Sequence, residues 1–315
     1  MNRSTSDQNP INPIIGVLTG ILCVSTASII IRFAQVEASS IVIAAARLLI
    51  ASFVLIPIAL IRHWQDIRRL SKPDLLRALL SGVFLALHFA SWIRSLEFTS
   101  VASSVVLVTT TPLWVALLSP LLLHEPIKRS VIIGLIVSMT GSVIVGLANA
   151  CGFSGERLVC QGQLVGENAV LGNFLALFGA WMAAGYMIIG RQLRKSLNTV
   201  AYTAIVYGTA AVILSIVVFI QGEPFWNYSS NTYLWLLALG IVPQLMGHSL
   251  LNWALRFISA AYVSLTLLGE PIGTVILAMI FLKESPTFLE GMGAILILLG
   301  IVIGSIGKAR QANAA

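Results

Sequence analysis

The chain has 315 residues, of which 57% are hydrophobic and only 10% are charged. A soluble globular protein carries about 25% charged residues, so this composition excludes a surface that faces water throughout. Apolar runs of about 20 residues predict an all-α integral membrane protein rather than a barrel, which would show shorter alternating segments. The net charge of +7 does not indicate nucleic-acid binding, because the basic residues lie in short loops between apolar runs.

The apolar runs predict ten transmembrane helices, since a helix bonds all of its backbone groups within one segment. A polar tail over residues 1–12 precedes the first run, which has no small-residue cleavage site and is expected to remain uncleaved. A longer segment over 149–169 divides the chain into five-helix units at 13–148 and 170–307, and 308–315 forms a second tail. The predicted spans are 13–33, 41–61, 75–96, 100–123, 129–148, 170–190, 199–220, 232–255, 259–282 and 288–307.

The distribution of Lys and Arg predicts the orientation. With the N-terminus in the cytoplasm, the cytoplasmic segments hold fourteen of the 19 basic residues, the external segments hold four, and Arg47 lies within a span. Cytoplasmic loops carry the excess of Lys and Arg. We therefore expect both termini in the cytoplasm of a cell whose inner membrane holds this multi-pass protein.

Two of the three cysteines, Cys151 and Cys160, lie on the predicted external segment. A local disulfide there suits an oxidising compartment, and two separate thiols are the alternative. The residues alone leave both open. Cys23 lies in the first apolar run and is expected to pack there.

The two halves repeat each other at an offset of 159 positions. This offset places Pro112 on Pro271 and Glu125 on Glu284, and it aligns glycines of the fifth and tenth spans. Since the halves are five helices apart, they must cross the membrane in opposite directions. Inverted repeats are a recurring transporter architecture, with the site near the midplane. The fold class is therefore predicted as two inverted five-helix repeats.

These segments carry a resemblance to a known family. TTTPLWVALLSPLLLHEPIKR followed by GLIVSMTGSVIVGL, and LLGEPIGTVILAMIFLKE followed by GMGAILILLGIVIGSIG, resemble the paired motifs of the drug/metabolite transporter superfamily. The resemblance is to its ten-helix branch of two EamA domains, and it covers about 14–147 and 171–306. It implies a transporter, usually an exporter, of amino acids or other small metabolites. It also implies alternating access, a proton gradient or exchange as the driving force, and a cavity lined by helices one, three, four, six, eight and nine.

Polar side chains at membrane depth give the candidate substrate site. Glu270 lies about halfway along the ninth helix, where a carboxylate is costly and functional by default, so it is the candidate for proton coupling. The alternative is a neutral Glu270 bonded to a backbone carbonyl freed by Pro271. Polar residues recur at i+4 on this helix and on the eighth, and interhelical hydrogen bonding is the alternative to a cavity. The stripe on the ninth helix consists of Tyr262, Thr266, Glu270 and Thr274. The stripe on the eighth helix consists of Gln244, His248 and Asn252.

Further candidates lie on the third and sixth helices. His88 and Trp92 are one turn apart, and Trp92 and Trp181 are too deep for the interfacial aromatic belt. His88 could bond for packing instead, and the tryptophans could fill space. Pro112 and Pro271 are expected to kink their helices, and Glu125 and Glu284 to close theirs. Arg47 is expected to be structural, pairing with a carboxylate or reaching the outer headgroups.

The functional prediction is a secondary transporter of small organic solutes in a lipid bilayer, with no cofactor or metal and with a homodimer allowed. An enzyme is disfavoured because HExxH, GxSxG and metal-spaced His/Cys motifs are absent from the sequence. A passive channel or a structural membrane protein is the remaining alternative. Apart from Glu270 and the histidines, little charge is expected in the cavity, which favours neutral, zwitterionic or cationic solutes.

Overall fold

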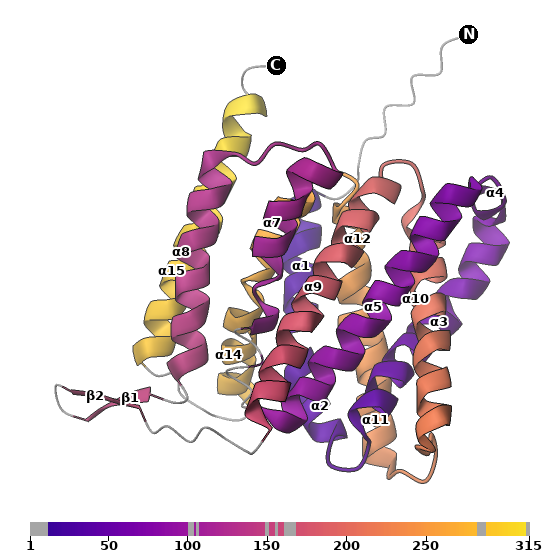
Figure 1. The fold of residues 1–315 in the computed structure, drawn as a ribbon, viewed down its shortest axis with the longest axis horizontal. Coiled ribbons are helices and arrows are strands. Elements are labelled where there is room, and N and C mark those ends of the chain that lie inside the picture. The colour runs from indigo at the N-terminus through magenta and orange to yellow at the C-terminus, as the bar shows by residue number, and fades with distance from the viewer. Residues whose placement is uncertain are drawn as a thin grey trace.

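The computed structural model describes residues 12–99, 104, 107–148, 151–154, 157–160, 168–281 and 288–312. Helices form almost all of the described chain, and one hairpin of two short strands lies in the central segment (Figure 1). The elements are α1 (Pro13–Ser25), α2 (Ala27–Ala34), α3 (Ser40–Arg62), α4 (Trp64–Arg68), α5 (Lys72–Phe98), α7 (Thr111–Leu122), α8 (Arg129–Ala148), β1 (Cys151–Ser154), β2 (Arg157–Cys160), α9 (Ala169–Leu193), α10 (Thr199–Gln221), α11 (Ser230–Leu239), the π-helix η1 (Gly240–His248), α12 (Ser249–Ala254), α13 (Ala260–Leu267), α14 (Glu270–Phe281) and α15 (Phe288–Ala312).

The described helices match the predicted spans in order. Six stretches are long and apolar enough to cross a membrane by themselves: Pro13–Ala34, Ser40–Arg62, Lys72–Phe98, Val170–Leu193, Thr199–Ile220 and Ser230–Ala254. The other four spans contain shorter apolar helices, because they are interrupted or include residues outside the described part. The membrane domain is thus the all-α, ten-helix arrangement of two repeats that the sequence predicts.

Three predicted spans are interrupted where the sequence suggested continuous helices. The first span consists of α1 and α2, which meet at Thr26. The Thr26 hydroxyl donates a hydrogen bond to the Cys23 carbonyl at 2.7 Å. The eighth passes from α11 through η1, which contains Pro243, into α12. The ninth is α13 and α14, and Pro271 lies in the first turn of α14, where its missing N–H costs no helical hydrogen bond.

Large apolar side chains cover the outside of the helix bundle. Phe53, Val170 and Phe219 expose 82%, 84% and 84% of their surface. Contiguous exposed apolar surface of this kind marks contact with a membrane or a partner. The lipid bilayer is the environment that satisfies it in a chain of this composition.

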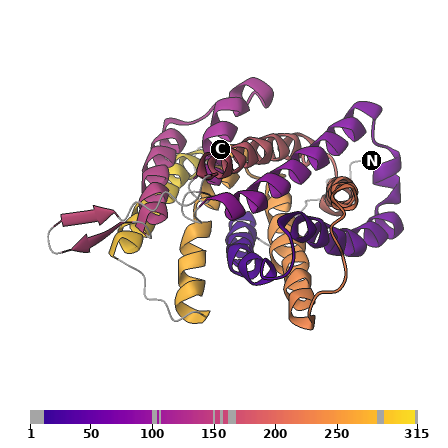
Figure 2. The ribbon, with the colours of Figure 1, turned by 60° about the horizontal axis from the view of Figure 1, so that its bottom comes forward.

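The two repeats pack about a shared axis. α8 lies against α15 and α3 against α10, and each of these pairs joins equivalent helices of the two halves (Figures 1 and 2). α1 packs on η1 and α12, while α5 packs on α9, so the first helix touches the eighth as the sixth touches the third. This reciprocity is what a two-fold axis between repeats produces.

Glycines bring α8 and α15 into backbone contact. A Cβ on Gly141 would lie 2.5 Å from the carbonyl oxygen of Gly293, and one on Gly134 would collide with the carbonyl of Gly300. The offset of 159 makes Gly134 equivalent to Gly293 and Gly141 to Gly300, so the two contacts are symmetry mates. The repeat seen in the sequence is therefore also a repeat of the packing.

The axis passes close to Ser138. Its hydroxyl donates to the Ile297 carbonyl at 3.1 Å, and the two residues are 159 positions apart, so each is the other's equivalent. Equivalent residues can touch in this way only beside the two-fold axis.

Loops that should share a side of the membrane gather together. At one end, the Glu37 carboxylate accepts a hydrogen bond from the Ser229 backbone N–H at 2.8 Å, joining the connections after the first and seventh helices. At the other end, Arg191 donates to the Glu125 carboxylate at 2.8 Å and to the Leu255 carbonyl at 2.7 Å. The connections after the fourth, sixth and eighth helices therefore meet, as an alternating ten-helix topology requires.

The hairpin of β1 and β2 bears on the two cysteines left open above. The strands are antiparallel with Cys151 opposite Cys160, and they project away from the helices (Figures 1 and 2). Directly opposed residues of an antiparallel pair have Cα atoms about 4.5–5.5 Å apart, which is within disulfide range. The backbone register therefore allows the disulfide that the sequence left open.

We expect Cys151 and Cys160 to resist alkylation until the protein is reduced. In protein purified from membranes without reductant, a bulky maleimide should modify neither of them before treatment with dithiothreitol and both afterwards, as measured by peptide mass spectrometry. Cys23, in the first span, is the internal control for denaturation. Full alkylation of both residues without reductant would show separate thiols.

Candidate functional site

The π-helix η1 carries two of the predicted site residues, Gln244 and His248. A π-helical turn inside a membrane helix is uncommon and frequently marks a functional site. Gln244 is fully buried, and its side-chain oxygen accepts a hydrogen bond from Arg47 Nε of α3 at 3.0 Å. The polar stripe of the eighth helix thus faces the protein interior.

Arg47 is the side chain that sequence reasoning placed least accurately. It is fully buried, so it does not reach the headgroups, and it is not part of any ion pair among the described residues. Its guanidinium lies 4.0 Å from the centre of the Phe89 ring, an electrostatically favourable arrangement. The His248 ring meets the same Phe89 edge-on at 5.3 Å. The second span (α3) and the eighth span (η1) therefore meet at Arg47.

His88 and Trp92 of α5 continue this cluster. His88 Nδ1 lies 2.9 Å from the Gly179 carbonyl oxygen of α9, so the ring donates its Nδ1 proton across the helix contact. Trp92 stacks on the imidazole, with ring centres 6.0 Å apart. The indole N–H of Trp92 is buried and has no hydrogen-bond partner among the residues that the structure describes. His88 has a packing hydrogen bond, and it also lies within electrostatic range of Arg47.

Glu270 begins α14, at the point where the ninth helix is interrupted. Its backbone carbonyl accepts hydrogen bonds from Ser25 at 3.0 Å and from Thr274 at 3.1 Å. Ser25 ends α1, so the breaks of the first and ninth helices lie side by side. Discontinuous helices that meet at mid-depth commonly build the binding sites of transporters.

Glu270 is half-buried. Its carboxylate accepts no hydrogen bond and joins no ion pair within the described part of the chain, although it lies within electrostatic range of Arg47. The alternative in which the carboxyl group caps a freed backbone carbonyl therefore has no counterpart in the described contacts. An acidic group held this way is available to a proton or to a solute.

Three other predicted residues lie outside this cluster or at its edge. The Thr266 hydroxyl donates a hydrogen bond to the Val263 carbonyl of its own helix at 2.7 Å. Tyr262 is buried on α13. Asn252 donates to the hydroxyls of Tyr186 and Tyr207, which fixes α12 against α9 and α10. The hydrogen bonds of Asn252 fit the interhelical alternative.

Trp181 belongs to a separate aromatic group between α7 and α9. Its ring meets Trp114 edge-on at 5.4 Å, and Phe174 and Phe178 lie against it. Its indole N–H is buried and finds no hydrogen-bond partner in the described part of the chain. Trp181 is therefore brought together with aromatic neighbours and not with the Arg47 cluster.

The four residues predicted to be structural lie at helix boundaries or outside the described residues. Pro112 and Pro271 occupy the first turns of α7 and α14. Glu125 pairs with Arg191, and with Lys195 at 3.3 Å. Glu284 lies outside the described residues.

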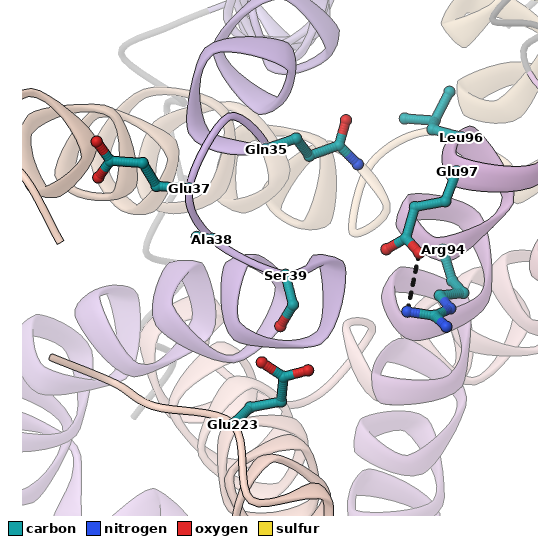
Figure 3. Close-up of a pocket in the computed structure, with 8 residues that line it drawn as sticks. All are labelled: Gln35, Glu37, Ala38, Ser39, Arg94, Leu96, Glu97 and Glu223. Carbon is teal, nitrogen blue, oxygen red and sulfur yellow. Dashed lines mark ion pairs between the residues drawn. The ribbon is translucent and has the colours of Figure 1, made fainter. Parts of the chain in front are cut away.

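A pocket of about 410 Å³ opens at the end of the bundle that holds Glu37 (Figure 3). Glu97 pairs with Arg94 at 2.9 Å on one side of it, and Glu223 reaches in from the connection after α10. The Ser229 backbone N–H and the Thr232 hydroxyl hold the pKa of Glu37 below its ordinary value. The mouth is therefore acidic. Its lining residues are Gln35, Glu37, Ala38, Ser39, Arg94, Leu96, Glu97 and Glu223.

Sequence reasoning left Arg47, Phe89, Ser25 and Arg191 out of the site. The signal for Arg47 was present, because an ionisable residue inside a span is a functional candidate by default. The others carry no such signal. Among the described residues, no three His, Cys, Asp or Glu side chains converge as a metal site would require.

The inverted repeats, interrupted helices and buried polar cluster define an integral membrane transporter. The model of the EamA-like transporter family matches residues 11–147 and 170–306. The chain belongs to this family, as the resemblance of its motifs indicated, and it is not an enzyme.

Similar proteins agree with this assignment. The chain is 23% identical over 243 residues to the uncharacterized transporter YxxF of Bacillus subtilis, covering 77% of this chain and 74% of that one. It is 25% identical over 251 residues to the uncharacterized transporter sll1319 of Synechocystis, covering 76% and 70%. A protein of known crystal structure superposes with a TM-score of 0.76 over 95% of this chain and 98% of its own at 18% identity, a likeness of fold.

Proposed function

We propose that this transporter is a secondary active exporter of small organic metabolites, such as amino acids or drugs, and that it works by alternating access with Glu270 as the proton carrier. The observation that carries the proposal is the Glu270 carboxylate, which lies at the meeting point of two interrupted helices and has no hydrogen bond or ion pair among the described residues. A half-buried ionisable group without a fixed partner can change its protonation state as its surroundings change. Such a group can couple solute movement to a proton gradient.

The two ends of the bundle support alternating access. The end with Glu125 is held together by hydrogen bonds from Arg191 and by the bond of Arg194 Nε to the Asn252 carbonyl at 3.1 Å. The opposite end holds the open pocket beside Glu37. One end closed by polar contacts and the other hollowed is the asymmetry that an alternating cycle would reverse. We propose that the closed end is cytoplasmic, that both termini lie there, and that the membrane is the inner membrane.

Flux through liposomes tests the proposal. Purified protein should give saturable flux of at least one small metabolite that depends on an imposed proton gradient. Flux that does not saturate would indicate a passive channel, and no flux of any metabolite in a broad panel would indicate a structural membrane protein.

Gln244→Ala and His248→Ala should each raise the apparent KM for the transported solute several-fold, because both side chains lie on η1 against Arg47 or Phe89. The measurement is initial flux against solute concentration. Gln65→Ala, on the exposed helix α4, is the matched control and should leave KM unchanged. If neither η1 substitution alters KM, the polar stripe of the eighth helix serves packing alone.

A further inference from the structure

We propose that Arg47 and Gln244 form a subsite that binds a carboxylate group of the transported solute. The inference rests on the proposed transport function and assigns one chemical group of its substrate. It revises the expectation, drawn from the sequence, that the site would hold little charge beyond Glu270 and the histidines.

The first argument is the kind of polar atom left unsatisfied. Arg47 is fully buried, and of its guanidinium nitrogens only Nε makes a hydrogen bond, to Gln244 Oε1. Within the described part of the chain, Nη1 and Nη2 have no hydrogen-bond partner, and Gln244 Nε2 makes no hydrogen bond of full geometry, although the Tyr207 hydroxyl lies close to the Gln244 side chain. Arginine has no acceptor atom, so Gln244 must turn its oxygen to Arg47 and point its NH₂ group away from it. Every unpaired group of this side-chain pair is thus an N–H donor.

The second argument is that, among the described residues, no acceptor lies within hydrogen-bonding distance of the two Nη groups of Arg47. The Phe89 ring covers one face of the guanidinium at 4.0 Å, and His248 packs on that ring. His88 uses its Nδ1 on Gly179. Buried donors are almost always hydrogen-bonded in folded proteins, so an occupant that brings acceptor oxygens fits the pair. The two Nη groups of a guanidinium match the two oxygens of a carboxylate in one plane.

The third argument concerns charge and selects a carboxylate over a phosphate. Glu270 is the carboxylate that Arg47 attracts electrostatically, and the two do not touch. A monoanionic solute group would bring the site one negative charge beside Glu270, whereas a phosphate dianion would bring two. Like charges in a low-dielectric site repel strongly. The subsite therefore suits a monocarboxylate.

Glu270 has the same chemical group as the proposed ligand, and the two would compete for Arg47. Removing the Glu270 charge should leave carboxylate binding intact or strengthen it, while gradient-driven flux is lost. This contrast separates the subsite from the proposed transport mechanism. If the protein binds carboxylates but transports no solute, the subsite proposal stands and the proposed transport function fails. If it transports solutes but shows no preference for carboxylates, the transport function stands and the subsite proposal fails.

The experiment compares carboxylates with their neutral carboxamides on the purified full-length protein in detergent. The probes are acetate, hexanoate and benzoate against acetamide, hexanamide and benzamide, with inorganic phosphate as a further probe, and binding is read from thermal shift and tryptophan fluorescence. We expect at least one carboxylate to bind tenfold or more tightly than its carboxamide. Equal binding within every pair, or phosphate binding more tightly than each carboxylate, would overturn the proposal.

Variants localise the effect. Arg47→Met should abolish the preference for carboxylates, and Arg47→Lys should weaken it, since an ammonium group cannot make the paired contact. Arg77→Met is the control, because Arg77 is exposed and pairs with Asp74 at the start of α5. If Arg47→Met does not yield monodisperse protein, Gln244→Leu replaces it and should reduce the preference at least threefold. An unchanged preference in the Arg47 variants, or in Gln244→Leu where it replaces them, would overturn the assignment.

Discussion

Replacing Glu270 with glutamine is expected to abolish gradient-driven solute flux while the protein remains folded in the membrane. Glutamine keeps the size of the side chain and cannot carry a proton. The described part of the chain gives the carboxylate no hydrogen bond or ion pair, so its loss should cost little stability. We expect the rate of proton-driven flux to fall at least a hundredfold in proteoliposomes.

The comparison variant for this prediction is Asp66→Asn, which removes an exposed carboxylate from α4. It should transport at the parental rate. Exchange of solute across the membrane without a gradient is a second readout, and Glu270→Gln should retain more of it than of gradient-driven flux. Parental gradient-driven flux in Glu270→Gln would remove this residue from the coupling mechanism.

Adding one methyl group at Gly141 is expected to destabilise the close contact between α8 and α15. The new Cβ would lie 2.5 Å from the Gly293 carbonyl oxygen, and backbone cannot turn aside as a side chain can. Overpacking of this kind costs about 1–3 kcal/mol, which outweighs the gain of up to about 1 kcal/mol from replacing glycine in a helix. Gly141→Ala should therefore lower the unfolding temperature in detergent.

Gly291 provides the matched control on the opposing helix. A Cβ there would meet nothing within 4 Å, so Gly291→Ala should leave the unfolding temperature unchanged or raise it. An equal response to both substitutions would show that α8 and α15 do not pack as closely as the structure has them.

The sequence predicted the helices well because lipid leaves the backbone few options. A segment in hydrocarbon must satisfy its own N–H and C=O groups, so length and apolarity locate each span. The repeat was also visible, since prolines, helix-ending glutamates and packing glycines recur where geometry is constrained. The contact of Gly141 with Gly293 gives a physical reason for that recurrence.

The details of the site depend on contacts that local sequence does not encode. Arg47 and Gln244 are 197 positions apart, and no periodicity in either helix brings them together. The i+4 stripe of the ninth helix assumed a continuous helix from Tyr262 to Thr274. The interruption between α13 and α14 ends that register, so Thr266 and Glu270 have different surroundings.

The hairpin and α4 were missed for a different reason. Both lie in connecting segments, where short polar stretches form local structure without an apolar period to reveal it. The two four-residue strands are below the length at which alternation is informative.

Side-specific labelling of single cysteines tests the inverted repeat most directly. In a background with Cys23, Cys151 and Cys160 replaced by serine, Arg69→Cys and Ser196→Cys should react with an impermeant maleimide only from the cytoplasmic side. Asn231→Cys, at the start of α11, should react only from outside. Labelling of Arg69→Cys and Ser196→Cys from opposite sides would contradict the two-repeat architecture and the site built on it.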